Sequence, residues 1–138
     1  MRAKILYILF FSLSLSAWGS EPWKLWLGNA EEKVVLRIDL NEETVTVPGM
    51  EMFGPQNGYL GGPGVYGVWT VTSFKVESDK TATLRLSNDL GSETQSIVLT
   101  QQTDSTYLME LKGGVVVKRA VNRKLVKIPQ KMELHIEQ

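Results

Sequence analysis

The sequence predicts a small all-β domain: an antiparallel meander that closes as a β-barrel, or else folds as a β-sandwich. Apolar and polar residues alternate along most of the chain, as in strands with one buried face. Turn signals rich in Asn, Asp and Gly separate these runs, and no amphipathic helical period follows residue 19. The barrel is the preferred form, because consecutive hairpins with short turns close naturally and leave no exposed sheet edge.

Residues 1–19 are predicted to be a cleavable secretory signal. A basic start precedes an apolar stretch from Ile5 to Leu15, and small residues surround a cut expected after Gly19. That stretch is well short of the ~20 residues that cross a bilayer. We therefore expect a single all-β domain of residues 20–138, secreted or periplasmic, with no transmembrane segment in the mature chain.

The strand predictions come from runs in which one face is apolar. Val34, Leu36 and Ile38, for example, share a face opposite Arg37 and Asp39. β-branched and aromatic residues, which suit a pleated surface, are frequent in these runs. In chain order the predicted strands cover residues 22–27, 33–40, 44–47, 65–76, 81–87, 94–101, 106–111, 115–121, 124–128 and 131–136.

The composition excludes several kinds of site. The chain has no cysteine, which rules out disulfides, thiolate metal sites, a cysteine nucleophile and a lipid-modified cysteine, so the mature form is expected to be soluble. Its one histidine, His135, is expected at the surface near the C-terminus. We therefore expect no cofactor and no metal. An enzyme is left open but disfavoured, since it would depend on carboxylates such as Glu51 or on tyrosines.

The segment 48–67 interrupts the alternating pattern. It holds seven glycines and three prolines, together with Met, Phe, Tyr, Leu and Val side chains that are too apolar for a freely solvated tail. It matches no nucleotide-binding fingerprint. Two interpretations stay open: a contact surface for a ligand or another protein, and a loop whose apolar side chains plug one end of the barrel.

The favoured hypothesis is a non-catalytic binding module that recognises an apolar small molecule, a glycan or an envelope component through this glycine-rich loop. The candidate ligand-binding residues are the aromatic and amide side chains in or beside the loop: Phe53, Asn57, Tyr59, Tyr66 and Trp69. The alternative is a protein–protein inhibitor, an immunity factor or an envelope assembly subunit that grips an exported protein with the same loop.

Three residues, Gly67-Val68-Trp69, resemble the Gly-x-Trp of the first strand of lipocalins. The predicted barrel is also of lipocalin-like size. The motif lies in the middle of this chain, where too few residues follow it for about eight strands. The chain is therefore not assigned to that family.

A basic tract near the C-terminus is the other distinctive feature. Residues 110–138 carry seven basic and three acidic groups, whereas residues 20–109 carry six basic and twelve acidic ones. The tract has no aromatic platform, so a nucleic-acid partner is not expected. It is either a solvated strand face or a contact for an anionic envelope surface, made by Lys118, Arg119, Arg123, Lys124 and Lys127.

Overall fold

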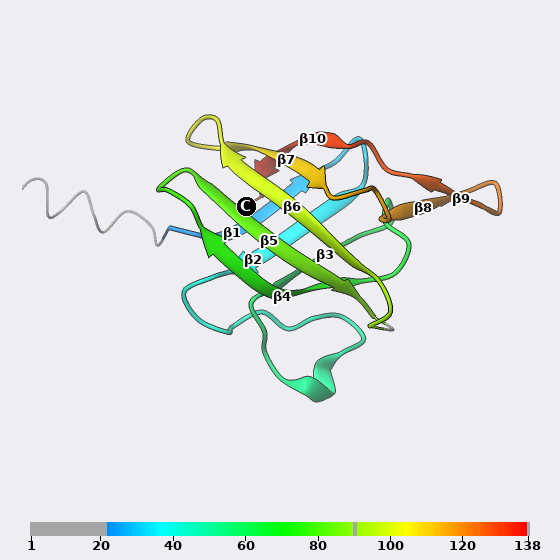
Figure 1. Ribbon diagram of the computed structural model, residues 1–138, viewed down its shortest axis with the longest axis horizontal. Coiled ribbons are helices and arrows are strands. Elements are labelled where there is room, and N and C mark those ends of the chain that lie inside the picture. The colour runs from blue at the N-terminus through cyan, green and yellow to red at the C-terminus, as the bar shows by residue number, and fades with distance from the viewer. Residues whose placement is uncertain (1–21, 90, 138) are drawn as a thin grey trace, which may run out of the picture.

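The computed structural model of the protein describes residues 22–89 and 91–137, and the predicted signal lies outside them. Within these residues eight strands form a closed antiparallel barrel, which confirms the barrel over the sandwich (Figure 1). The barrel strands are β1 (Lys24–Asn29), β2 (Val34–Asp39), β3 (Gly58–Gly61), β4 (Trp69–Val76), β5 (Thr81–Asn88), β6 (Thr94–Gln101), β7 (Thr106–Lys112) and β10 (Lys131–Ile136). Two further strands, β8 (Lys118–Val121) and β9 (Lys124–Lys127), form a separate hairpin.

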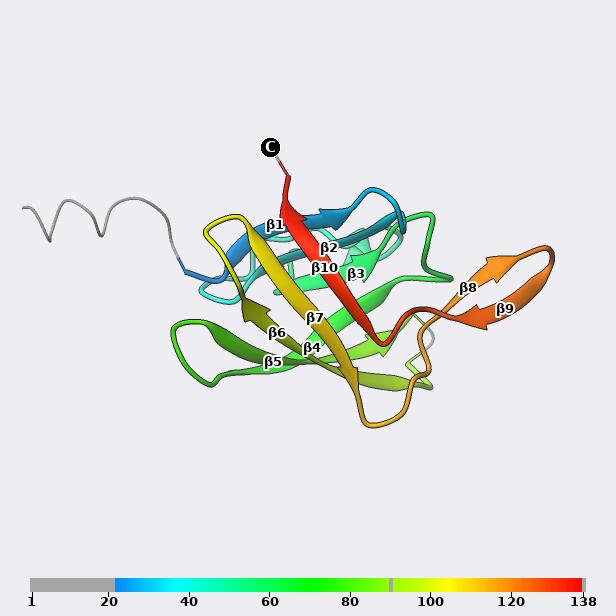
Figure 2. The same cartoon turned by 90° about the horizontal axis from the view of Figure 1, so that it is seen from above.

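The barrel is a meander closed by its last strand. Strands β2 to β7 follow one another in chain order, and β10 pairs with β7 on one side and with β1 on the other. The β8–β9 hairpin, here called the basic hairpin (residues 118–127), is inserted between β7 and β10. It extends beyond one end of the barrel, as Figure 2 shows. Closure leaves no free edge in the eight-stranded sheet.

The interior is filled by the apolar faces that the alternation predicted. Every barrel strand contributes fully or nearly fully buried side chains, among them Leu36, Leu84, Leu99 and Leu134. The end opposite the basic hairpin is closed by Trp23, whose ring meets that of Tyr107 edge-on with centroids 6.3 Å apart. Because the chain has no cysteine and therefore no disulfide, side-chain packing must stabilise the barrel.

The predictions for residues 44–47 and 48–67 are wrong in detail. Residues 44–47 form no regular strand; a single bridge joins Val45 to Gln56. The glycine-rich segment is not one loop, because Gly58–Gly61 forms β3 and pairs with both β2 and β4. Gly58 is required there by close approach, since a Cβ would lie 2.3 Å from the carbonyl oxygen of Arg37. Strand 65–76 likewise begins only at Trp69, and strand 115–121 only at Lys118.

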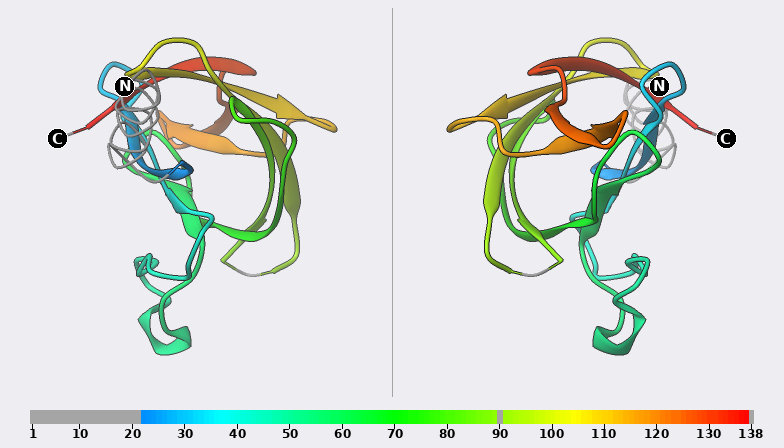
Figure 3. Two further views of the ribbon diagram at one scale, coloured as in Figure 1. Left: turned by 90° about the vertical axis from the view of Figure 1, so that its left-hand side faces the viewer. Right: turned by 90° about the vertical axis from the view of Figure 1, so that its right-hand side faces the viewer.

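The true irregular connection is the long loop (residues 40–57) between β2 and β3. It projects from the side of the barrel and carries one turn of 3-10 helix, Glu51–Phe53 (Figure 3). Its base packs on the outer barrel surface, where Val45, Val47 and Tyr59 form a second, smaller apolar cluster. Val45 and Val47 of this loop therefore cover the outside of the barrel, whereas Leu60 and Val65 of the glycine-rich segment 48–67 are buried in the main core. In the described residues no helix is long and apolar enough to span a membrane.

Candidate ligand-binding site

The five predicted ligand-binding residues lie in three different places. Asn57 ends the long loop and Tyr59 lies in the adjoining strand β3, while Phe53 lies at the tip of the loop. Tyr66 and Trp69 lie together at the end of the barrel that carries the basic hairpin. The structure thus brings two of the five residues into one site and separates the other three from it.

The polar groups of Asn57 hold the long loop together. Its backbone carbonyl accepts a hydrogen bond of 2.7 Å from the amide of Asp39, and its side-chain Nδ2 donates to the Asp39 carbonyl at 3.0 Å. The side chain of Asp39 accepts hydrogen bonds from Thr44 Oγ1 and from the amides of Asn41 and Glu42. Asn57 therefore has a structural partner, and these contacts pin both ends of the loop.

The same contacts set the pKa of Asp39, which is almost fully buried. Burial by itself would raise the pKa of this carboxyl. The hydrogen bonds from Thr44, Glu42 and Asn41, together with the positive charge of Lys24, outweigh burial and leave the pKa below its ordinary value. Asp39 is therefore a charged residue that stabilises the loop.

Tyr59 and Phe53 differ sharply in exposure. Tyr59 is buried on the outer face of the barrel beneath Val45 and Val47. Phe53 is 66% exposed and its neighbour Met52 is 84% exposed. In this structure a ligand reaches Phe53 freely and does not reach Tyr59.

A pocket of about 440 Å³ opens at the hairpin end of the barrel. Its walls come from segments that are distant in sequence: the turn before β4, the β5–β6 turn, the segment after β7 and the basic hairpin. The lining residues are Tyr66, Gly67, Trp69, Asn88, Asp89, Ser92, Glu93, Val116, Lys118 and Leu125. The pocket thus joins part of the glycine-rich segment to part of the basic tract, which the sequence analysis treated separately.

Trp69, in the wall of the pocket, has a hydrogen-bond donor without an acceptor among the described residues. Its side chain is 2% exposed and packs with the barrel core. The indole Nε1 is buried and has no acceptor among the described residues. A buried donor without a partner costs about 1–3 kcal/mol, so an acceptor supplied by a ligand would stabilise the site. Tyr66, 61% exposed, provides an accessible aromatic ring beside it.

The β5–β6 turn supplies a preformed polar wall. Asn88 Oδ1 accepts hydrogen bonds from the amides of Ser92 and Glu93 at 3.0 and 3.3 Å. Asn88 Nδ2 in turn donates to Ser92 Oγ and Glu93 Oε1. In residues 22–89 and 91–137 the carboxylate of Asp89 has no hydrogen bond or ion pair, so it is available as an acceptor for a ligand hydroxyl.

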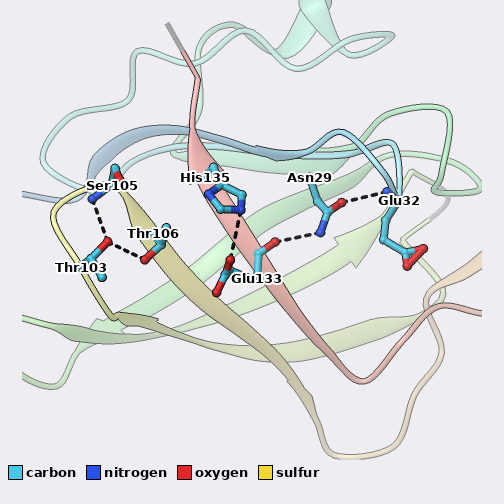
Figure 4. Close-up of polar contacts among 7 residues, drawn as sticks. All are labelled: Asn29, Glu32, Thr103, Ser105, Thr106, Glu133 and His135. Atoms are coloured by element: carbon cyan, nitrogen blue, oxygen red, sulfur yellow. Dashed lines mark hydrogen bonds and ion pairs between the residues drawn. The ribbon is translucent and has the colours of Figure 1, made fainter.

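Buried contacts hold the basic hairpin against the barrel end. Val117 and Ile128 at its base are buried in the core. Arg119 Nη1 pairs with Glu32 Oε1 at 3.0 Å. Asn29 in turn orients Glu32, because its Oδ1 accepts a hydrogen bond from the backbone amide of Glu32 (Figure 4). The Nδ2 of Asn29 donates a hydrogen bond to the backbone carbonyl of Glu133.

A second pocket, of about 370 Å³, lies at the opposite end of the barrel. It is lined by Trp23, Trp26 and Tyr107 with Asp79, Asp104 and Gln101, among others. Burial raises the pKa of Tyr107 there. The Trp26 ring is already covered on one side by Arg37, whose guanidinium carbon lies 5.6 Å from the ring centroid. Among the described residues this pocket has none of the five predicted ones and no buried donor without an acceptor, so the hairpin-end pocket is the stronger candidate.

No cluster of three or more His, Asp or Glu side chains that could hold a metal occurs in the part of the chain that the structure describes. His135 lies exposed on the outer face of β10, where Nε2 is 3.2 Å from Glu133 Oε1, as Figure 4 shows. The surface position predicted for His135 is therefore confirmed.

Comparison with known proteins adds no analogue of this site, because no protein-family model, curated protein or solved structure matches the chain.

Proposed function

We propose that the protein is an exported binding module whose hairpin-end pocket holds a hydroxyl-bearing ring, such as one sugar unit of a glycan. The observation that carries this proposal is the indole N–H of Trp69, a residue that lines the pocket: this N–H is buried and lacks an acceptor among the described residues. The small closed barrel is a suitable rigid support for such a site.

The chemistry of the lining favours a sugar over a purely apolar molecule. Tyr66 and Leu125 offer apolar surface to the C–H face of a ring. The Asp89 carboxylate can accept from ring hydroxyls, while the Trp69 indole N–H and the Lys118 ammonium can donate to ring oxygens. Polar and charged residues make up half of the lining, and the side chains of two of them, Asp89 and Lys118, have no partner among the described residues, so an apolar ligand would leave these two unpaired.

The test is a calorimetric titration of residues 20–138 with glucose, galactose and N-acetylglucosamine. One of these sugars should bind, and Tyr66→Ala should weaken that binding about three- to ten-fold by removing the stacked ring. Phe53→Ala is the matched control, an equally exposed aromatic outside the pocket, and should leave the affinity unchanged. Equal losses in the two variants, or no binding of any sugar, would contradict the proposal.

A second candidate function uses the tip of the long loop. Met52 and Phe53 are adjacent, highly exposed and carried away from the barrel (Figure 3). Such a tip suits an apolar socket on an exported partner protein. Native mass spectrometry of protein recovered from its host should then show a macromolecular partner that Met52→Ser with Phe53→Ser releases; a partner retained by that variant would exclude this role.

The basic hairpin supports one further proposal, contact with an anionic surface of the envelope. Among the described residues Lys118, Arg123, Lys124 and Lys127 make no ion pair, so their charges are free for an outside partner.

A further inference from the structure

We infer that the basic hairpin is a docking arm for an anionic phospholipid bilayer, with its turn at the depth of the headgroups. The hairpin carries five basic residues and no acidic one over residues 118–127. It extends beyond the end of the barrel, where a flat surface can approach it (Figures 1 and 2). Four of its basic side chains have no ion-pair partner among the described residues.

The pairing within the hairpin concentrates charge at a cost to its own stability. Lys118 lies directly opposite Lys127 across the two strands, and like charges in that position destabilise a ladder. Val121 pairs with Lys124, so the connecting turn has two residues, Asn122 and Arg123, both with positive φ. Asn tolerates that conformation, but Arg at φ 68° is strained where Gly would fit. This strained turn position thus carries a positively charged side chain.

Apolar side chains among the charges favour a bilayer over a soluble polyanion. Val121 and Val126, which share one face of the hairpin, are 42% and 46% exposed. An anionic polysaccharide in water offers these side chains nothing to pack against. A bilayer offers phosphates to the lysines and the acyl boundary to the two valines, the combination that interfacial segments use.

The positions of the acidic side chains bear on how the molecule would face a membrane. Of the acidic groups near the hairpin, Glu32 is paired with Arg119, and that pair fixes the hairpin against the barrel. Asp89 and Glu93 line the pocket beside Lys118. The long loop, which has the acidic residues Glu42, Glu43 and Glu51 and no basic one, projects in a different direction (Figures 1 and 3). The molecule can therefore approach an anionic membrane hairpin first without bringing that acidic loop to the surface.

The experiment is sedimentation of residues 20–138, which contain every strand, with vesicles of phosphatidylglycerol and phosphatidylcholine in equal parts. Binding should occur, should weaken as salt is raised, and should be absent on vesicles of phosphatidylcholine alone. Lys124→Gln with Lys127→Gln should weaken it about 25-fold, at about five-fold for each charge. The control, Lys75→Gln with Lys80→Gln, removes the same charge at the opposite end of the barrel and should change binding by less than about two-fold.

Two further variants separate the bilayer from other partners. Val121→Ser with Val126→Ser should weaken vesicle binding about five-fold or more and should leave binding of soluble dextran sulfate unchanged. Tyr66→Ala should leave vesicle binding unchanged, so a failed sugar titration and a failed vesicle assay are distinguishable. No binding to anionic vesicles, equal losses in the two lysine pairs, or tight dextran sulfate binding without vesicle binding would each overturn the inference.

Discussion

At the scale of single residues, position 64 requires glycine because another backbone segment lies too close to admit a side chain. A Cβ at Gly64 would lie 1.9 Å from the carbonyl oxygen of Glu32 and 2.9 Å from that of Lys33. Its amide donates to the same Lys33 carbonyl at 2.7 Å. The backbone of the turn before β4 is thus pressed against the β1–β2 turn, and this contact positions Tyr66 beside the pocket.

Gly64→Ala should therefore destabilise the fold by about 2–3 kcal/mol, because backbone atoms must shift to admit the methyl group. The measurement is urea unfolding followed by tryptophan fluorescence. Gly61→Ala is the control in the same segment: its Cβ would meet only ring carbons of Tyr59, at 3.3 Å, so the loss should be smaller. Equal midpoints for the two variants would contradict the role given to Gly64.

The lowered pKa of Asp39 predicts that the free energy of unfolding falls as the solution becomes acidic. Its pKa is lowered in the folded chain, so the carboxylate contributes fully above the ordinary pKa of about 3.9, and the contribution is lost as the pH falls toward the lowered folded value. Asp39→Asn should cost about 1–3 kcal/mol at pH 7 and should flatten the decline below about pH 4.

Unfolding curves at several pH values test this prediction. Asp79→Asn is the control, because Asp79 is exposed in the β4–β5 turn. The account of Asp39 fails if the Asp39→Asn protein keeps the acid dependence of the unmodified chain.

Residue types alone could predict part of the site. Tyr66 and Trp69 were identifiable as aromatics beside a glycine-rich turn. The structural roles of Asn57 and Tyr59 were not, because they depend on Asp39 and Val47, which lie elsewhere in the sequence. Asp89 and Lys118 were not predicted as pocket residues for the same reason: only closure of the barrel brings the β5–β6 turn and the basic tract together.

At the scale of elements, the basic hairpin depends on one part-buried ion pair. Glu32→Gln would leave Arg119 facing a neutral amide, with its Nε and Nη2 already without partners in the described chain. The pair is partly exposed, so the expected cost is only about 1 kcal/mol. Trypsin should then cleave within residues 118–127 about two- to five-fold faster, since the hairpin opens more often.

Mass spectrometry of the first fragments measures that rate. The control is Glu133→Gln, which removes a carboxylate paired only with the exposed His135. Unchanged cleavage in the Glu32→Gln protein would show that the apolar base of the hairpin, Val117 and Ile128, holds it without the ion pair.

Strand prediction succeeded where the alternation of apolar and polar residues was long. It failed where the apolar residues pack on the outside of the barrel. β5, β6 and β7 each have several inward apolar residues and were found nearly to the residue. Val45 and Val47 also alternate, yet they pack on the outer surface of the barrel and have only an isolated bridge. β3 is four residues long with glycine at both ends, so no local signal marks it as a strand.

At the scale of the whole molecule, closure of the barrel brings segments that are distant in sequence together at its two ends. One end is closed by Trp23 and Tyr107, and the other carries the pocket and the basic hairpin. The all-β class and the barrel followed from periodicity and turn spacing. The composition of each end did not, because it depends on how β10 returns to pair with β1 and β7.

The most direct test of the proposed site is a proton–nitrogen NMR titration of residues 20–138 with the same three sugars. That chain has three indole N–H groups, those of Trp23, Trp26 and Trp69. The Trp69 signal alone should move as its orphaned donor gains an acceptor, with Trp69→Phe identifying the resonance. Movement of the Trp23 or Trp26 signal while that of Trp69 stays fixed would place binding at the opposite end of the barrel and contradict the account, as would three unmoved signals.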